Sequence, residues 1–154
     1  MKEKAKILTM AFAGLLLLAM FLPQQTMAQK GNQSQIVEKI INLPDLQQFY
    51  PVVPGDNAKQ VTIVQFPVAV PSDISAPGKT IVLTDRENLQ RSATNGYFMF
   101  RSIEVNQNTA KVVGHYFYNY NSATNKSEII AITADLQKTG SEWMIVNANV
   151  KGVE

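Results

Sequence analysis

Few side chains in this sequence could transfer a proton, and two of them fall in segments that alternate like β-strands. His115 is the only histidine, and the ordinary pKa of imidazole suits a general base near neutral pH. Asp135 is expected to lie across from Trp143 in the last hairpin, where an indole would raise the pKa of the carboxyl and suit it to acid or base work. Each residue also has a plain structural interpretation, as a half-buried strand residue or as a solvated carboxylate at a strand edge.

Aromatic side chains in the same region are candidates for ligand binding. Tyr116, Tyr118 and Tyr120 recur at every second position, so a strand would place them as a ladder on one face of a sheet. Together with Trp143 they are the predicted ligand-binding residues, because each ring offers apolar area and a hydrogen-bonding group. Tyrosines are also common in strands without any such role.

Metal and cofactor sites are not expected. The chain has no cysteine and a single histidine, which argues against zinc, and no run of acidic residues has the spacing of a calcium loop. The segment Pro77–Thr80 lacks the earlier glycine of a phosphate-binding loop and leads into a strand-like run. The sequence therefore predicts neither a metal nor a cofactor.

Residues 1–28 have the three parts of a secretory signal peptide. Lys2, Lys4 and Lys6 precede an apolar run over Ile7–Leu22, and a small residue, Ala28, follows the polar break. A membrane anchor is the rival interpretation, but the run is shorter than the ~20 residues that span a bilayer. We expect cleavage near Ala28, no stable membrane anchor afterwards, and a periplasmic or secreted protein.

The net charge of the chain comes from this signal. Of 14 basic and 12 acidic residues, removal of residues 1–28 leaves eleven of each sign. A neutral domain lacks the positive surface expected of a nucleic-acid binder or of a protein held on anionic lipid. The remainder predicts a flexible leader at residues 29–33 and a single domain at residues 34–154, which contains no disulfide.

The first half of this domain is expected to contain helices and two strands. Ser34 is a plausible N-cap for a helix with an apolar stripe from Ile36 to Leu43, and Pro44 suits the start of a second short helix. Strands are predicted at residues 61–70 and 80–83. Thr84 and Glu87 match a capping box for a brief helix.

Four strand-like runs in the last part predict an antiparallel meander, because short polar loops join them. The runs cover residues 97–105, 110–120, 127–137 and 142–150. In the first hairpin the pattern pairs Val105 with Ala110, Ile103 with Val112, and Glu104 with Lys111. In the last hairpin it pairs Ala134 with Met144 and Ile132 with Val146, which would continue an apolar face.

Both faces of this meander carry apolar residues, so both are expected to be covered. The N-terminal helices can cover one face. The other requires curvature into a pocket, the remaining strands or a partner subunit. The predicted fold class is α+β: N-terminal helices packed on a curved, mainly antiparallel sheet that ends in a four-strand meander.

The order of elements and the closing segment Gly140–Val146, with a tryptophan just after the turn, resemble the NTF2-like and cystatin-like α+β domains. This resemblance implies a helix-first antiparallel sheet around a cone-shaped pocket. NTF2-like enzymes use Asp, Tyr or His residues in such a pocket. The signal resembles that of an exported protein from a Gram-negative bacterium.

Two functional hypotheses follow. The first is an exported, non-catalytic binding module for a small apolar ligand or an envelope protein partner. The alternative is an NTF2-like enzyme in which His115 or Asp135 transfers the proton. A homodimer with packed sheet faces is a third arrangement, with its function elsewhere.

Overall fold

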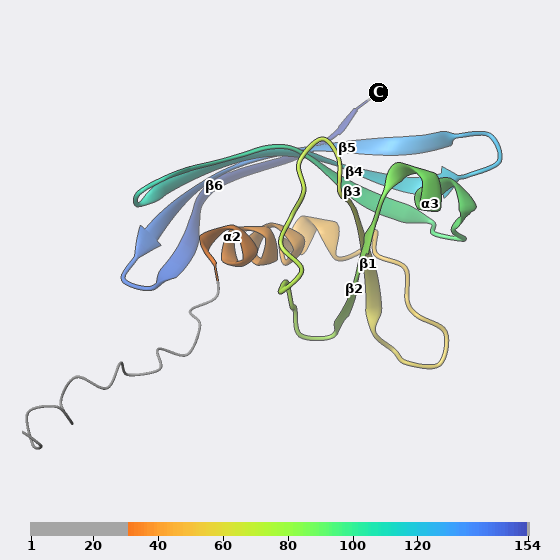
Figure 1. Ribbon diagram of the computed structural model, residues 1–154, viewed down its shortest axis with the longest axis horizontal. Coiled ribbons are helices and arrows are strands. Elements are labelled where there is room, and N and C mark those ends of the chain that lie inside the picture. Colours follow the sequence, from red (N-terminus) through yellow and green to blue (C-terminus); the bar gives the residue numbers. More distant parts are fainter. Residues whose placement is uncertain (1–30, 154) are drawn as a thin grey trace, which may run out of the picture.

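The computed structural model describes residues 31–153, and the predicted signal peptide lies outside them. The described residues form one open sheet with the strand order β2-β1-β3-β4-β5-β6 (Figure 1). Its strands are β1 (Lys59–Val64), β2 (Lys79–Thr84), β3 (Gly96–Asn106), β4 (Thr109–Asn121), β5 (Lys126–Thr139) and β6 (Glu142–Val153). The helices are α2 (Asn32–Ile41), the single 3-10 turn η1 (Pro44–Leu46) and α3 (Arg86–Arg91). The predicted α+β class and the mainly antiparallel sheet are confirmed.

The four long strands β3 to β6 form the predicted antiparallel meander. In its first hairpin Val105 pairs with Ala110, Ile103 with Val112, and Glu104 with Lys111, as expected. The pattern succeeds here because a one-residue slip would exchange apolar and charged faces. Strand β1 joins this meander in parallel with β3, and β2 runs parallel to β1.

The predicted register of the last hairpin is wrong. Ala134 pairs with Ala148 rather than Met144, and Ile132 pairs with Val150 rather than Val146. Strand β5 continues to Thr139, so the turn is only two residues long, and β6 contains an extra residue opposite the Asp135/Leu136 step. This odd shift reverses the faces of β6 near the turn, which leaves Met144 56 % exposed and buries Trp143 completely.

Three local predictions near the N-terminus also need correction. Helix α2 begins at Asn32, inside the segment expected to be a leader, so Ser34 is not its N-cap. Ser34 is buried, and its hydroxyl donates a hydrogen bond to Asp73. The expected second helix is only the turn η1.

The strand expected at residues 61–70 ends at Val64. The side chain of Gln65 explains this end, because its amide donates to the carbonyl oxygen of Val70 at 2.9 Å and accepts from the Val70 N–H at 2.6 Å. These two bonds close a loop where the strand was expected to continue.

Alternation along the strands divides the apolar side chains into two clusters on opposite faces of the sheet. We call the first the core face; it contains Phe98, Phe100, Tyr116 and Trp143, and the buried residues of α2 belong to the same cluster. Figure 1 shows α2 running beside the sheet, and it contacts β3 and β6. We call the second the pocket face; its cluster comprises Val64, Leu89, Tyr97 and Tyr120, with Met99 and Phe117 packed against them.

Candidate functional site

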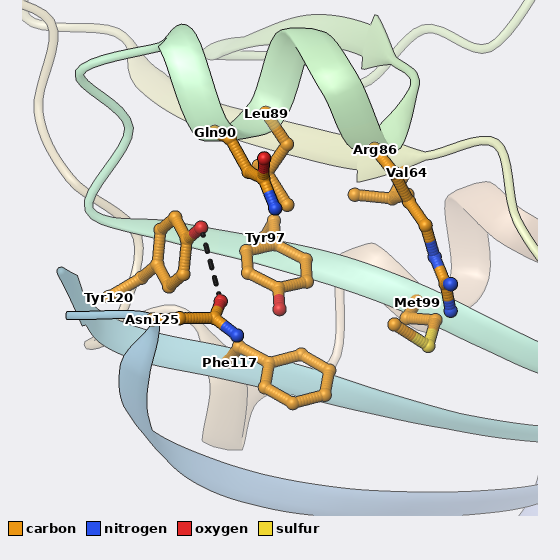
Figure 2. Close-up of a pocket in the computed structure, with 9 residues that line it drawn as sticks. All are labelled: Val64, Arg86, Leu89, Gln90, Tyr97, Met99, Phe117, Tyr120 and Asn125. Carbon is orange, nitrogen blue, oxygen red and sulfur yellow. Dashed lines mark hydrogen bonds between the residues drawn. The ribbon is translucent and has the colours of Figure 1, made fainter. Parts of the chain in front are cut away.

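A pocket of about 330 Å³ lies on the pocket face, between α3 and the strands β3 and β4 (Figure 2). This volume is at the lower end of the range typical of small-molecule sites. The lining residues come from the strands β1, β3 and β4, from α3 and from the loop that follows β4. They are Val64, Arg86, Leu89, Gln90, Tyr97, Met99, Phe117, Tyr120 and Asn125.

Two stacked aromatic rings form the floor of the pocket. Tyr97 and Phe117 are direct partners across the β3–β4 ladder, and their rings are stacked with centroids 4.6 Å apart and planes inclined by 12°. Directly paired residues of neighbouring strands lie side by side on one face, which holds the two rings together. The result is a fixed aromatic pair that borders the pocket.

Tyr120 reaches this face because of a β-bulge in β4. Between the pairs Tyr118–Glu128 and Asn121–Lys126, β4 has two residues where β5 has one. Asn119 takes a positive φ of 52°, a conformation that asparagine tolerates better than most residues. The bulge turns Tyr120 away from the face of Tyr118, so its ring packs edge-on against Tyr97 at 5.1 Å.

Helix α3 supplies the opposite wall. The carboxylate of Asp85 caps it by accepting from the Asn88 N–H at 2.7 Å, so Asp85 and not the predicted Thr84 is the N-cap. Leu89 points into the pocket-face cluster and is 6 % exposed. Figure 2 shows Gln90 beside it and Arg86 reaching down the other end of the pocket towards Met99.

Arg86 brings a positive charge to this pocket without a balancing carboxylate. The carbon of its guanidinium lies 3.9 Å from the ring centroid of Phe66, a cation–π contact. Among residues 31–153 its guanidinium has no ion-pair or hydrogen-bond partner, and none of the nine lining residues is acidic. The electrostatic character of the pocket is therefore positive at the end where Arg86 lies.

The hydroxyl of Tyr97 is the second polar group available in the pocket. The residue is only 7 % exposed, yet its hydroxyl has no hydrogen-bond partner among residues 31–153. Figure 2 shows this hydroxyl in the middle of the pocket. Burial raises the pKa of Tyr97, nearby Tyr120 raises it further, and Arg86 opposes the rise. Tyr97 is therefore a neutral hydroxyl that a bound molecule could contact.

The predicted tyrosine ladder is divided between the two faces. Tyr116 is fully buried on the core face, and its hydroxyl donates to the carbonyl oxygen of Phe49 at 3.2 Å. Tyr118 donates to the carboxylate of Glu128 at 2.6 Å. Trp143 is fully buried, and its indole N–H donates to Asn32 at 3.3 Å. Of the four predicted ligand-binding residues, Tyr120 is the one that lines the pocket.

The two candidate catalytic residues lie outside this pocket and apart from each other. Asp135 is exposed and pairs with Lys111 and Asn147, so the expected position across from Trp143 is wrong. His115 is half-buried on the pocket face, with its ring centroid 6.1 Å from that of Phe117. Burial, together with the charge of Arg101, holds the pKa of His115 below its ordinary value.

Comparisons with known proteins do not place this chain in a family. No protein-family model matches it, and searches of curated proteins and of solved structures find no match. The resemblance to NTF2-like and cystatin-like domains therefore stays a prediction.

Two further findings concern the described residues alone. Within residues 31–153 no three His, Cys, Asp or Glu side chains come together as a metal site would require. None of the helices in that part of the chain is long and apolar enough to span a membrane.

Most residues of the pocket were not among the sequence candidates. Neither Arg86, which lies inside the predicted capping box Thr84–Glu87, nor Tyr97, which precedes Phe98, belongs to a sequence motif that indicates a pocket. The available signal was the second apolar face of the meander. That face was predicted to need a cover, and α3 provides one over its β3–β4 end.

Proposed function

We propose that this protein is an exported, non-catalytic binding module that holds a small ligand with a flat, apolar body in the pocket beneath α3. The observation that carries the proposal is Tyr97, a residue only 7 % exposed whose hydroxyl has no partner among residues 31–153 and stays accessible from the pocket. A ligand in the pocket could take the place of the water that binds this hydroxyl.

The shape of the pocket supports a flat ligand. The stacked rings of Tyr97 and Phe117 border the pocket, and the ring of a flat ligand can pack against their edges or against an outer face. Leu89 lies opposite this floor as part of the same cluster. The buried residues of α2 belong to the cluster of the core face. In this proposal the ligand binds on the other side of the sheet, the pocket face.

A fluorescent probe tests the proposal directly. N-phenylnaphthylamine is neutral, flat and bright only in apolar surroundings, so titration of the purified protein should give a saturable signal. The variant Met99→Trp would fill the pocket and should weaken binding at least about tenfold, equivalent to ~1.4 kcal/mol. Val113→Trp is the matched control, because Val113 is also half-buried on the pocket face but does not line the pocket.

Thermal unfolding of both variants separates loss of binding from loss of folding. Equal weakening by both tryptophan substitutions, or no saturable binding by the unsubstituted protein, would reject the pocket as a binding site.

The enzymatic alternative, with His115 or Asp135 as the proton-transfer group, has less support. Neither residue lines the pocket, and a general acid or base must be within hydrogen-bond reach of the bound molecule. His115 lies nearer, beside Phe117 of the floor, so it is the better candidate for this alternative.

A protein partner from the cell envelope, or a second copy of this chain, is the other occupant that we consider. One observation favours it: β6 is an edge strand, on which Met144 and Val146 are 56 % and 66 % exposed. Exposed edge strands offer unpaired backbone groups to a partner. Light scattering of the protein before and after Val146→Lys tests this, and a monomer in both cases would reject self-association through β6.

A further inference from the structure

We propose that the ligand of this pocket is an anion: a flat ring system that carries a carboxylate or sulfonate group, with the charged group at Arg86 and the ring on the Tyr97–Phe117 stack. This inference rests on the proposed binding function and adds the chemical class of the ligand. Three observations carry it.

The first observation is the unbalanced charge of Arg86. Arg86 is exposed, and its guanidinium pairs with no carboxylate among residues 31–153. Of its two acidic neighbours in the sequence, Glu87 forms no ion pair with it, and Asp85 already binds both the backbone and the side-chain amide of Asn88. The forked donors of the guanidinium thus remain available to a planar anion.

The second observation is that Arg86 is positioned by an aromatic ring and not by an ion pair. Its guanidinium stacks over Phe66 at 3.9 Å. This contact limits the orientations of the side chain but does not use its N–H donors. An arginine that stacks on a ring retains its hydrogen-bond donors for a bound group. Figure 2 shows that this arginine extends along the pocket towards Met99.

The third observation is the composition of the remaining polar lining. Besides Arg86, the pocket presents the side chains of Gln90 and Asn125 and the hydroxyls of Tyr97 and Tyr120, and no carboxylate. The hydroxyl of Tyr120 has only a long contact, 3.5 Å, with Asn125. These neutral groups can donate to an anion, whereas a cationic ligand would meet Arg86 without any acidic residue to offset it.

The geometry favours a ring over an extended chain as the body of the ligand. The pocket is about 330 Å³, and two aromatic rings held together in a stack border it. A ring of the ligand can pack edge-to-face or with an offset against these rings, an interaction that a linear acyl chain does not make.

A matched pair of probes tests the charge requirement. Anilinonaphthalene sulfonate and N-phenylnaphthylamine share one ring scaffold, and only the former carries an anionic group. The unsubstituted protein should bind the sulfonate at least about tenfold more tightly than the neutral probe, a typical gain for one charge-assisted contact. Arg86→Gln should remove this preference by weakening the sulfonate alone, while Arg91→Gln, which changes the same charge on the same helix outside the pocket, should preserve it.

The outcomes separate the inference from the function on which it rests. Equal affinities for the two probes, or a preference that survives Arg86→Gln, would overturn the anionic class while the pocket remains a binding site. Failure of Met99→Trp to weaken either probe would overturn the binding site and the inference together.

Competition decides the shape of the ligand. Naphthoate, a flat aromatic carboxylate, should displace the bound sulfonate probe at lower concentration than decanoate, a linear carboxylate of similar size. If decanoate displaces the probe at the lower concentration, the inference that the ligand contains a ring is rejected, and a fatty acid becomes the better candidate. The Arg86→Gln variant is the control, because naphthoate should no longer displace the probe at a lower concentration than decanoate there.

Discussion

Two tyrosines on the paired strands β3 and β4 show how differently the two faces of the sheet are built. On the core face, Tyr116 is fully buried and donates its hydroxyl to the carbonyl oxygen of Phe49 at 3.2 Å. On the pocket face, Tyr97 is almost as deeply buried, at 7 % exposure, but its hydroxyl has no partner among residues 31–153. The first face is complete by itself, whereas the second keeps a polar group and a cation available. Burial alone therefore does not distinguish the two tyrosines; the hydrogen-bond partner of the hydroxyl does.

The largest effect is expected from truncation of the core face. Trp143→Ala should lower the free energy of unfolding by about 3–5 kcal/mol, because it removes a fully buried indole and leaves a cavity. Phe117→Ala on the half-buried pocket face should cost less than about 2 kcal/mol. Urea denaturation measures both, and equal costs would show that the pocket face is a second structural core.

A smaller effect is expected at Gly96, which lies close against Tyr116. A Cβ added at Gly96 would lie 2.5 Å from the hydroxyl oxygen of Tyr116 and 2.9 Å from the carbonyl oxygen of Phe117. Gly96→Ala should therefore destabilise the protein by about 1–3 kcal/mol, as overpacking commonly does. Gly152→Ala is the matched control, since nothing lies within 4 Å of the added atom there. A neutral Gly96→Ala in urea denaturation would contradict the close packing beneath Tyr116.

Removal of the hydroxyl from Tyr116 or from Tyr97 compares the two faces of the sheet most directly. Tyr116→Phe removes a buried hydrogen bond and leaves the carbonyl of Phe49 without it, at an expected cost of about 1 kcal/mol. Tyr97→Phe removes a hydroxyl with no partner in the described chain, so its unfolding free energy should change by less than about 0.5 kcal/mol.

Binding should reverse this order. Tyr97→Phe should weaken the anilinonaphthalene sulfonate probe, while Tyr116→Phe should leave its affinity unchanged. Similar effects of the two substitutions on both stability and binding would remove the distinction between the faces.

The smallest effect concerns pH. Because burial and Arg101 lower the pKa of His115 in the folded chain, the unfolded chain takes up the proton first as pH falls. The contribution to stability should thus be present above the ordinary histidine pKa of about 6.5 and decrease as the pH falls below it. His115→Gln should flatten this decrease in thermal unfolding. An unchanged pH profile in the variant would show that other groups cause it.

Local pattern predicted much of the sheet but little of the pocket. The pairing of Glu104 with Lys111 follows from alternation and a short loop, and the structure has it. The predicted register of the last hairpin is wrong because Lys138 and Thr139 have the polar character of loop residues, yet they continue β5 to a two-residue turn at Gly140. The parallel pairing of β1 with β2 and β3 joins segments that are distant along the chain, and no local signal carries it.

The pocket could not be predicted from the sequence for a related reason. Its residues come from segments that are separate in the sequence. Strict alternation along β4 predicts Tyr120 on the same face as Tyr118, and this prediction is wrong. The bulge at Asn119 interrupts that period. Arg86 has no distinguishing neighbour in the sequence, and its contact with Phe66 depends on where α3 packs.

That bulge has an evolutionary consequence. It consists of one residue more in β4 than in the facing part of β5. A descendant that lost Asn119 would have Tyr120 directly after Tyr118, and regular alternation would still place the two rings on opposite faces. The pocket would then keep its tyrosine although β4 is one residue shorter, so in such lineages the two tyrosines would be adjacent in the sequence and the period-two spacing would be gone.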